Sequence, residues 1–361
     1  MKIRRLINCY IPVSVCNLTC RYCYVPQFEG RKKNAMPNWA LTPVDIGKAL
    51  SNRRLGGPCV MNICGDGETL IPAEVPEIIR ELLLQGHVIE LVTNGLLTNR
   101  INEILTFDAS LLSRLEFKFS YHYEQLKERG LLETFWNNVY AIKQKGCSFT
   151  IELTPHDELI PLIDEIKEDC LTHVGALCHV TTTFDYSKNM ILNTNLTKDE
   201  YERIWGQFDS PMFKFKMSVL GEKRNEYCYA GEFLMSVDLA SGLAHQCYCG
   251  KSQNIYKNID KPIKWNAIGH HCEYPMCFNA HALLVFGAIP MIAKNIFYSD
   301  IRNRICEDGT EWLQKPVKQA FDSKFIDMNR EYSFSQKVLN EIQVGIQVFF
   351  QKVRSKLKNE R

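Results

Sequence analysis

The stretch Cys16-Asn17-Leu18-Thr19-Cys20-Arg21-Tyr22-Cys23 places three cysteines on one short segment with the spacing C-x3-C-x2-C. It directly follows residues 6–13, an apolar segment that predicts a β-strand. A four-iron cluster is normally held by four cysteine thiolates. Three thiolates on one loop can therefore hold such a cluster and leave one iron open to a ligand that is not protein.

The same cysteines could instead belong to a zinc site or to disulfides. Structural zinc sites are closed by four ligands, usually in two pairs, and no partner pair with that spacing lies near residues 16–23. The cysteine count of 15 is odd, and no signal peptide directs the chain to an oxidising compartment. The spacing therefore favours an iron-sulfur cluster.

Composition predicts an ordinary globular protein. A length of 361 residues fits one large barrel plus an appendage, and 45% of the residues are apolar. The net charge of +2 provides no overall field to attract nucleic acid. The longest apolar run, residues 282–293, is interrupted by Gly287 and Pro290 and is too short to span a bilayer. We expect a cytoplasmic protein.

Strand and helix patterns alternate along the first half of the chain. Strands are predicted at residues 6–13, 60–64, 87–92, 115–120, 149–153 and 180–184. Helices are predicted between them, at residues 43–53 (with Thr42 as N-cap), 74–85, 132–145 and 158–169. Such alternation predicts an α/β fold with parallel strands and right-handed crossovers.

Three polar segments follow predicted strands. They are the cysteine loop, Gly65-Asp66-Gly67-Glu68 and Thr93-Asn94-Gly95. In barrels of parallel strands the active site forms at the carboxyl ends of the strands. We therefore expect these three segments to meet at one site.

The cysteine motif, with Tyr22 just before its last cysteine, resembles the signature of the radical S-adenosylmethionine (radical SAM) superfamily. The resemblance covers about residues 1–210 and implies a partial (β/α)6 barrel. It implies that Cys16, Cys20 and Cys23 hold a [4Fe-4S] cluster whose open iron binds S-adenosylmethionine. An electron from the cluster then splits that molecule into methionine and a 5′-deoxyadenosyl radical. A reductant such as flavodoxin or ferredoxin is implied as a partner.

The same resemblance assigns further residues to the binding of S-adenosylmethionine. Gly65-Asp66-Gly67-Glu68 is similar to the glycine-glycine-glutamate motif of the family, in which a carboxylate meets the methionine amino group. Asp66 stands where the family often has glycine. Tyr22, Asn94 and Ser120 are implied as further contacts.

Each of these contacts also has a simpler interpretation. Thr93-Asn94-Gly95 could be a turn in which the asparagine bonds its own backbone, and Ser120 an ordinary strand-end hydroxyl. His122, Glu152 and His156 lie in or after strands and could face a substrate, although lone residues of these types are more often structural.

A second group of cysteines follows residue 210, namely Cys228, Cys247, Cys249, Cys272 and Cys277. The spacing Cys228-x13-Gly242-x4-Cys247 resembles the opening of SPASM and twitch extensions, which carry auxiliary iron-sulfur clusters. Five cysteines are too few for the two clusters of a SPASM extension. The resemblance therefore implies one auxiliary [4Fe-4S] cluster on Cys228, Cys247, Cys272 and Cys277, with Cys249 as a substitute. A zinc site on the same cysteines is the alternative.

These features predict three regions: a barrel at residues 1–210, an auxiliary-cluster domain at 211–300 and a helical segment at 301–361. The last region includes an amphipathic helix at residues 333–357, which we expect to cover the core or to form a dimer. Its apolar stripe consists of Phe334, Val338, Ile342, Ile346, Phe349, Val353 and Leu357.

The resemblance implies hydrogen abstraction from a substrate, with a peptide or protein side chain as the first expectation. The alternative substrate is a small sugar-like or cyclitol alcohol. No leader-peptide-binding domain is expected before the barrel, because Cys16 lies so early, and this weakens the peptide interpretation. A non-catalytic iron-sulfur or zinc scaffold is the alternative from another class. Near-neutral charge disfavours RNA modification.

Overall fold

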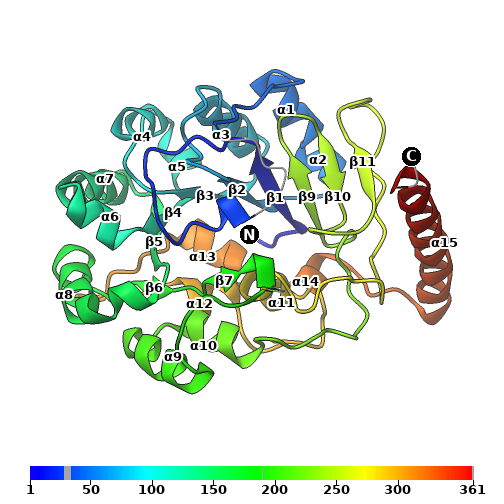
Figure 1. Ribbon diagram of the computed structural model, residues 1–361. Helices are drawn as coiled ribbons and strands as arrows, with labels where there is room; N and C mark the ends of the chain where they lie inside the picture. The colour runs from blue at the N-terminus through cyan, green and yellow to red at the C-terminus, as the bar shows by residue number, and fades with distance from the viewer. Residues whose placement is uncertain (28–33, 189, 360–361) are drawn as a thin grey trace.

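The computed structural model describes residues 1–27, 34–188 and 190–359, with side chains up to residue 346. Six parallel strands lie side by side in chain order (Figure 1). They are β1 (Arg5–Ile11), β2 (Cys59–Gly65), β3 (Val88–Thr93), β4 (Leu115–Tyr121), β5 (Ser148–Leu153) and β6 (His179–Val180). The predicted α/β fold with a mostly parallel sheet is confirmed.

Helices cover the outer face of this curved sheet (Figure 1). They are α1 (Pro43–Ala49), α2 (Asn52–Leu55), α3 (Val75–Leu84), α4 (Thr98–Ile104), α5 (Ala109–Leu112), α6 (Tyr123–Glu128), α7 (Leu132–Gln144) and α8 (Ile163–Val174). Alternate residues of each strand, such as Ile7, Met61 and Phe117, are fully buried in the core between sheet and helices. This alternation follows from the two-residue period of a strand.

Two predicted helices are divided in the structure. Residues 43–53 form α1 and α2, because Ser51 is extended, with φ −61° and ψ 149°. Residues 158–169 begin as the 3-10 helix η2 (Asp157–Leu162) and become α-helical only in α8. Pro161 has no backbone N–H to donate, and it lies at this change. The predicted N-cap Thr42 is confirmed, since its side chain accepts a hydrogen bond from the Asp45 N–H.

The sixth strand is shorter than predicted. Only His179 and Val180 pair with β5. Phe184–Asp185 (β7) turns away and pairs antiparallel with Ile191–Leu192 (β8) in a separate small sheet. The 3-10 turn η3 (Tyr186–Lys188) connects β7 to β8. The helix α9 (Lys198–Trp205), the 3-10 turn η4 (Gly206–Phe208) and the helix α10 (Pro211–Ser218) then follow along the chain. A further 3-10 turn, η1 (Val25–Gln27), follows the cysteine loop.

The cysteine-rich region adds strands to the same sheet. Leu234–Asp238 (β9) pairs parallel with β1, and Leu243–His245 (β10) and Ser252–Asn254 (β11) continue antiparallel beyond it. In the described chain the order is β11-β10-β9-β1-β2-β3-β4-β5-β6. The barrel and the cysteine-rich region therefore share one sheet.

The inner face of the sheet is closed by the last third of the chain. This part forms α11 (Ala280–Phe286), α12 (Tyr298–Arg302), α13 (Lys315–Phe321) and α14 (Phe325–Met328). All residues of α11 are buried, in a second core that includes Leu6 of β1 and Val88 of β3. The chain after Cys277 therefore packs directly against the barrel strands.

The predicted C-terminal helix is present as α15 (Phe334–Asn359), at one edge of the molecule (Figure 1). Asn340 and Val344 are buried, and the Asn340 amide donates to the Ala267 carbonyl at 2.8 Å. The predicted apolar stripe does not cover the core, since Phe334 is 84% exposed and Ile342 54% exposed. The side chains of Phe349, Val353 and Leu357 lie outside the described part.

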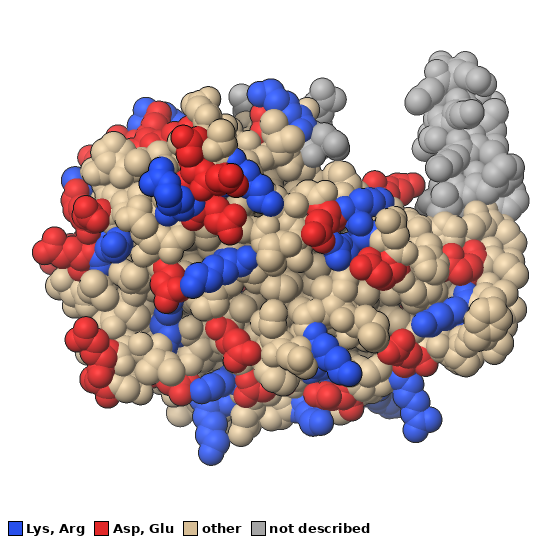
Figure 2. All heavy atoms as spheres, turned by 90° about the horizontal axis from the view of Figure 1, so that it is seen from below, with Lys and Arg blue, Asp and Glu red and all other residues tan. Residues whose placement is uncertain are grey.

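Charges of both signs are interspersed on the face shown in Figure 2. This mixture agrees with the small net charge of the chain. Within the described residues, no helix combines the length and apolar character needed to cross a membrane.

Candidate active site

The glycine loop after β2 holds the segment that leads to Cys16. The Gly67 N–H donates to the Val13 carbonyl at 2.7 Å, and the Glu68 N–H donates to the Val15 carbonyl at 2.9 Å. A Cβ atom on Gly67 would lie 2.0 Å from the Val15 carbonyl oxygen. Only glycine permits this approach, so Gly67 positions the cysteine loop against the end of β2.

Glu68 joins the same loop to the end of β3. Its side chain is buried, with 2% of the residue exposed. The carboxylate accepts hydrogen bonds from the Thr93 hydroxyl at 2.7 Å, the Asn94 N–H at 2.8 Å and the Leu70 N–H at 3.1 Å. Burial raises the pKa of Glu68, and these three hydrogen bonds oppose that rise.

Asn94 extends the connection to the cysteine motif. Its amide donates to the Asn17 side-chain oxygen at 2.6 Å and lies 3.9 Å from the Cys16 sulfur. Its own oxygen accepts from the Leu96 N–H at 3.2 Å, which is the self-bonded turn considered from the sequence. The asparagine therefore both forms the turn and contacts the loop of Cys16.

The three motif cysteines lie together on the loop after β1. Burial raises the pKa of the Cys20 thiol to about 12, and the neighbouring Cys16 and Cys23 contribute to the rise. Thiols clustered in this way become thiolates only when a cation neutralises them. Three such sulfurs on one loop, at the meeting point of three strand ends, fit the irons of a cluster.

Tyr22 is held by two histidines from later strands. Its hydroxyl hydrogen-bonds His122 Nδ1 at 2.7 Å, and its ring stacks on His156 with centroids 4.2 Å apart. His122 directly follows β4 and His156 follows β5. Burial lowers the pKa of His122 to about 4, so this imidazole is neutral at pH 7. Sequence reasoning did not link these histidines to Tyr22; their position after strands was the available signal.

The remaining candidates occupy the same end of the sheet. Asp66 accepts a hydrogen bond from the Tyr10 hydroxyl at 2.6 Å. Ser120 is half-buried near the end of β4. Glu152, on β5, forms ion pairs with Lys118 at 3.3 Å and with Arg302, so it belongs to a buried charge cluster.

A profile of the radical SAM superfamily matches residues 10–158, which include the cysteine loop, the glycine loop and Asn94. The chain contains a radical SAM superfamily domain. The cysteine loop, the glycine loop and Asn94 lie at the carboxyl ends of the first three strands of this domain.

Several solved structures are similar to this chain over most of its length. Streptococcus suis SuiB bound to S-adenosylmethionine has a TM-score of 0.51 and 13% identity, over 72% of this chain and 65% of SuiB. SuiB bound to its precursor peptide SuiA has a TM-score of 0.51 and 12% identity, over 72% and 64%. A histidine-tagged form of anSMEcpe with bound AdoMet has a TM-score of 0.49 and 16% identity, over 71% and 78%.

The chain thus spans 65% of the length of the S-adenosylmethionine-bound SuiB structure. Comparison with curated protein sequences gives no match. At these identities the likeness to SuiB establishes a shared fold and nothing further.

The second cysteine group lies outside the matched radical SAM domain. Its five members line one cavity: Cys228, Cys247, Cys249, Cys272 and Cys277. The Cys249 thiol donates to Cys272, and this hydrogen bond is the main reason that the pKa of Cys272 falls to about 6. The structure therefore brings together all five cysteines that the spacing singled out; their role as ligands stays a prediction.

Aromatic rings connect this cavity with the radical SAM domain. Tyr24, next to Cys23, lies 5.7 Å from Tyr186, which lies 5.6 Å from Phe278. Phe278, next to Cys277, lies 4.6 Å from Tyr248. All of these rings are at least partly exposed. The region between the two cysteine groups is therefore lined by aromatic side chains.

Proposed function

We propose that the protein is a radical SAM enzyme whose [4Fe-4S] cluster is held by Cys16, Cys20 and Cys23. The observation that carries this proposal is the convergence of the cysteine loop, the glycine loop and Asn94 at the carboxyl ends of three strands. When bound there, the cluster supplies the electron that splits S-adenosylmethionine into methionine and a 5′-deoxyadenosyl radical, the species that abstracts hydrogen from the substrate.

The protein residues bind and orient S-adenosylmethionine in this proposal. Glu68 uses three hydrogen bonds to fix its carboxylate, and a carboxylate offers about four acceptor positions, so one remains for the methionine amino group. Tyr22 presents a ring whose position is set by His122 and His156. Gly65, Asp66, Gly67, Asn94 and Ser120 complete the proposed binding set.

We propose that the second cysteine group holds one auxiliary [4Fe-4S] cluster, as in twitch-like extensions. Its ligands would be Cys228, Cys247, Cys272 and Cys277, with Cys249 as the substitute for one of them. The supporting observation is that all five sulfur-bearing residues line the same cavity. Cys249 and Cys272 share a hydrogen bond, so they are the pair between which the ligand choice lies.

The proposed substrate is a peptide or protein side chain. SuiB, whose structure has been solved with a precursor peptide, shares this fold. Tyr24, Tyr186, Tyr248 and Phe278 line the region between the two cysteine groups. Ring faces and phenol hydroxyls can hold an extended peptide by apolar contact and hydrogen bonding.

The test of the first proposal is the anaerobic formation of 5′-deoxyadenosine from S-adenosylmethionine and a strong reductant, measured by chromatography. We expect the product with wild type, none with Cys20→Ala, and wild-type amounts with Cys147→Ala, a buried cysteine outside both groups. Product formation by Cys20→Ala, or its absence from iron-loaded wild type, would contradict the assignment. The second outcome would favour a non-catalytic iron-sulfur scaffold.

Iron and sulfide content tests the auxiliary cluster. We expect about eight irons in wild type and about four in the triple Cys16, Cys20 and Cys23 to alanine variant. Cys247→Ala should lose iron while keeping the cluster of the radical SAM domain, observed by electron paramagnetic resonance. About four irons in wild type, with zinc at the second group, would reject the auxiliary cluster and leave the first proposal intact.

A further inference from the structure

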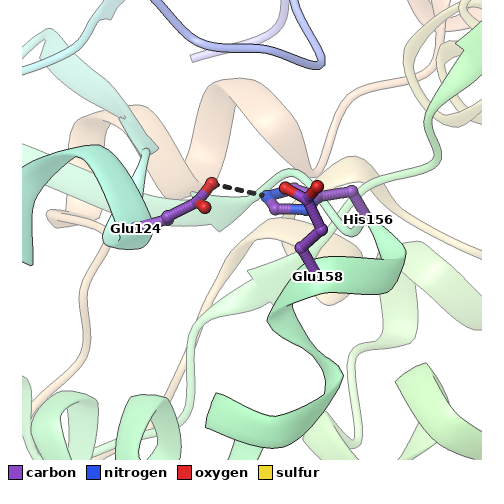
Figure 3. A group of neighbouring side chains, drawn as sticks. All are labelled: Glu124, His156 and Glu158. Atoms are coloured by element: carbon purple, nitrogen blue, oxygen red, sulfur yellow. Dashed lines mark ion pairs between the residues drawn. The ribbon is translucent and has the colours of Figure 1, made fainter. Parts of the chain in front are cut away.

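A separate group of potential metal ligands lies beside Tyr22. It consists of Glu124 on α6, His156, and Glu158 on η2 (Figure 3). One ligand atom from each residue lies within 4.8 Å of the others. Figure 3 shows the two carboxylates and the imidazole directed toward a common point from the chain after β4 and the chain after β5.

Two buried atoms of this group lack hydrogen bonds within the described chain. His156 is 6% exposed, and its Nε2 atom has no hydrogen-bond partner. The Oε2 atom of Glu124 is also buried and unpaired by hydrogen bonds. The two atoms face each other at 3.7 Å, too far for a hydrogen bond. Buried polar atoms normally have partners, so their convergence indicates a ligand between them.

The spacing suits a metal ion. Imidazole nitrogen and carboxylate oxygen bind zinc-like ions at about 2.0–2.2 Å, which places neighbouring ligand atoms of a tetrahedral site about 3.4 Å apart. The observed 3.7 Å between His156 Nε2 and Glu124 Oε2 is close to this separation.

Arg21 is the competing cation at this group. Its guanidinium pairs with Glu124 Oε1 and lies 3.6 Å from Glu158 Oε2. The Arg21 side chain is 60% exposed, so it can turn into solvent without disturbing the core. A divalent ion would place more charge between the carboxylates than Arg21 does, and it would also bind His156 Nε2, which has no hydrogen bond within the described chain.

We propose that Glu124, His156 and Glu158 bind a divalent transition-metal ion in competition with Arg21, at a site distinct from both cysteine groups. One nitrogen and two carboxylate oxygens suit Mn²⁺, Fe²⁺ or Zn²⁺. Arg21 lies between Cys20 and Cys23, and His156 stacks on Tyr22. Occupancy of the site therefore acts on the cysteine loop by releasing Arg21 and by fixing His156 against Tyr22.

The test is Mn²⁺ binding to the full-length, cluster-reconstituted protein in its oxidised state, followed by the electron paramagnetic resonance signal of free Mn²⁺. We expect Glu158→Gln and His156→Gln to weaken binding at least tenfold. Arg21→Gln should tighten it severalfold, because the competitor is removed. Glu128→Gln is the matched control, since Glu128 also lies near Arg21, at 3.7 Å, but outside the ligand group.

Unchanged Mn²⁺ affinity in Glu158→Gln and His156→Gln would overturn the proposal. An equal loss of Mn²⁺ affinity in Glu128→Gln would also overturn it, because that result would show only a general response to the loss of a negative charge. The Glu158 side chain is 58% exposed, so this variant should fold normally. Binding of Mn²⁺ does not require cleavage of S-adenosylmethionine, and its failure would leave the proposed function standing.

Discussion

At residue 67 a single methyl group decides whether the cysteine loop can lie against β2. We expect Gly67→Ala to lower the free energy of unfolding by about 1–3 kcal/mol, because its Cβ would lie 2.0 Å from the rigid Val15 carbonyl. The displaced loop should also hold less iron. Urea unfolding and iron content of the reconstituted protein measure the two effects.

Gly206→Ala is the matched control for this substitution. Gly206 has helical backbone angles, φ −61° and ψ −20°, and a Cβ there meets no atom within 4 Å. We expect its stability and iron content to match wild type. Equal iron content in the Gly67 and Gly206 variants would mean that the close approach does not position the cysteine loop.

His87 makes stability depend on pH. The ring is fully buried, accepts from the Cys59 N–H at Nδ1 and donates from Nε2 to the Leu50 carbonyl, so only a neutral ring fits. Burial lowers its pKa to about 4. The unfolded chain, with a histidine pKa of about 6.5, then binds more protons between these values, and stability falls as the pH falls through this window.

We expect the titration of His87 to lower the free energy of unfolding by about 2 kcal/mol when the pH falls from 7 to 5. Other histidines also titrate, so the measurement compares wild type with His87→Gln by urea unfolding at both pH values. The variant should be less stable at pH 7 but should lose less on acidification. Equal losses in the two proteins would show that His87 is not the source of the pH dependence.

The N-caps of α9 and α10 differ in burial and in the number of elements that they bond. Thr197 and Glu200 form a capping box at the start of α9, at the surface. Ser210 caps α10 while fully buried, and its oxygen accepts from both the Phe213 N–H and the Val180 N–H of β6. Ser210→Ala should therefore cost about 2 kcal/mol, more than Thr197→Ala, because two buried donors lose their acceptor. Thermal and urea unfolding compare the variants; a smaller loss for Ser210→Ala would contradict this reasoning.

Arg302 connects the C-terminal third of the molecule to the barrel. It is fully buried, pairs with Glu116 at 3.1 Å and with Glu152, and donates to the Thr150 hydroxyl. We expect Arg302→Met to lower the free energy of unfolding by about 3–5 kcal/mol, because Glu116 loses its buried ion-pair partner and Glu152 keeps only Lys118. Urea unfolding at pH 7 measures the loss.

Neutralising Glu116 provides the control. The double variant Arg302→Met, Glu116→Gln should regain part of the lost stability, since Glu116 then carries no charge and Glu152 keeps its ion pair with Lys118 at 3.3 Å. If the double variant were no more stable than Arg302→Met, the loss would come from packing of the arginine stem rather than from charge.

Local patterns were sufficient for the order and type of most elements. The positions of β1–β5 followed from side-chain alternation, and the N-cap Thr42 followed from short-range hydrogen bonding. These signals act within a few residues, so they are readable without a fold. The grouping of the cysteine loop with the glycine loop and Asn94 followed from the common edge of parallel strands.

Contacts between distant segments were not readable in this way. The short strand β9 depends on pairing with β1, and Pro161 and Ser51 divided helices that periodicity alone made continuous. Likewise, the apolar stripe of α15 predicted a helix that covers the core or forms a dimer, and Phe334 and Ile342 of this stripe are exposed. Whether a surface of the same chain lies opposite a helix depends on the rest of the fold.

The sequence by itself determined that this chain has a parallel α/β sheet with three cysteines on the loop after its first strand, because strand period and motif spacing are local. Only the tertiary structure decided that His122 and His156 hold Tyr22, and that Arg302 pairs with the buried Glu116. The physical reason is that these interactions join residues 100 to 186 positions apart, and their energy depends on burial that exists only after the chain has folded.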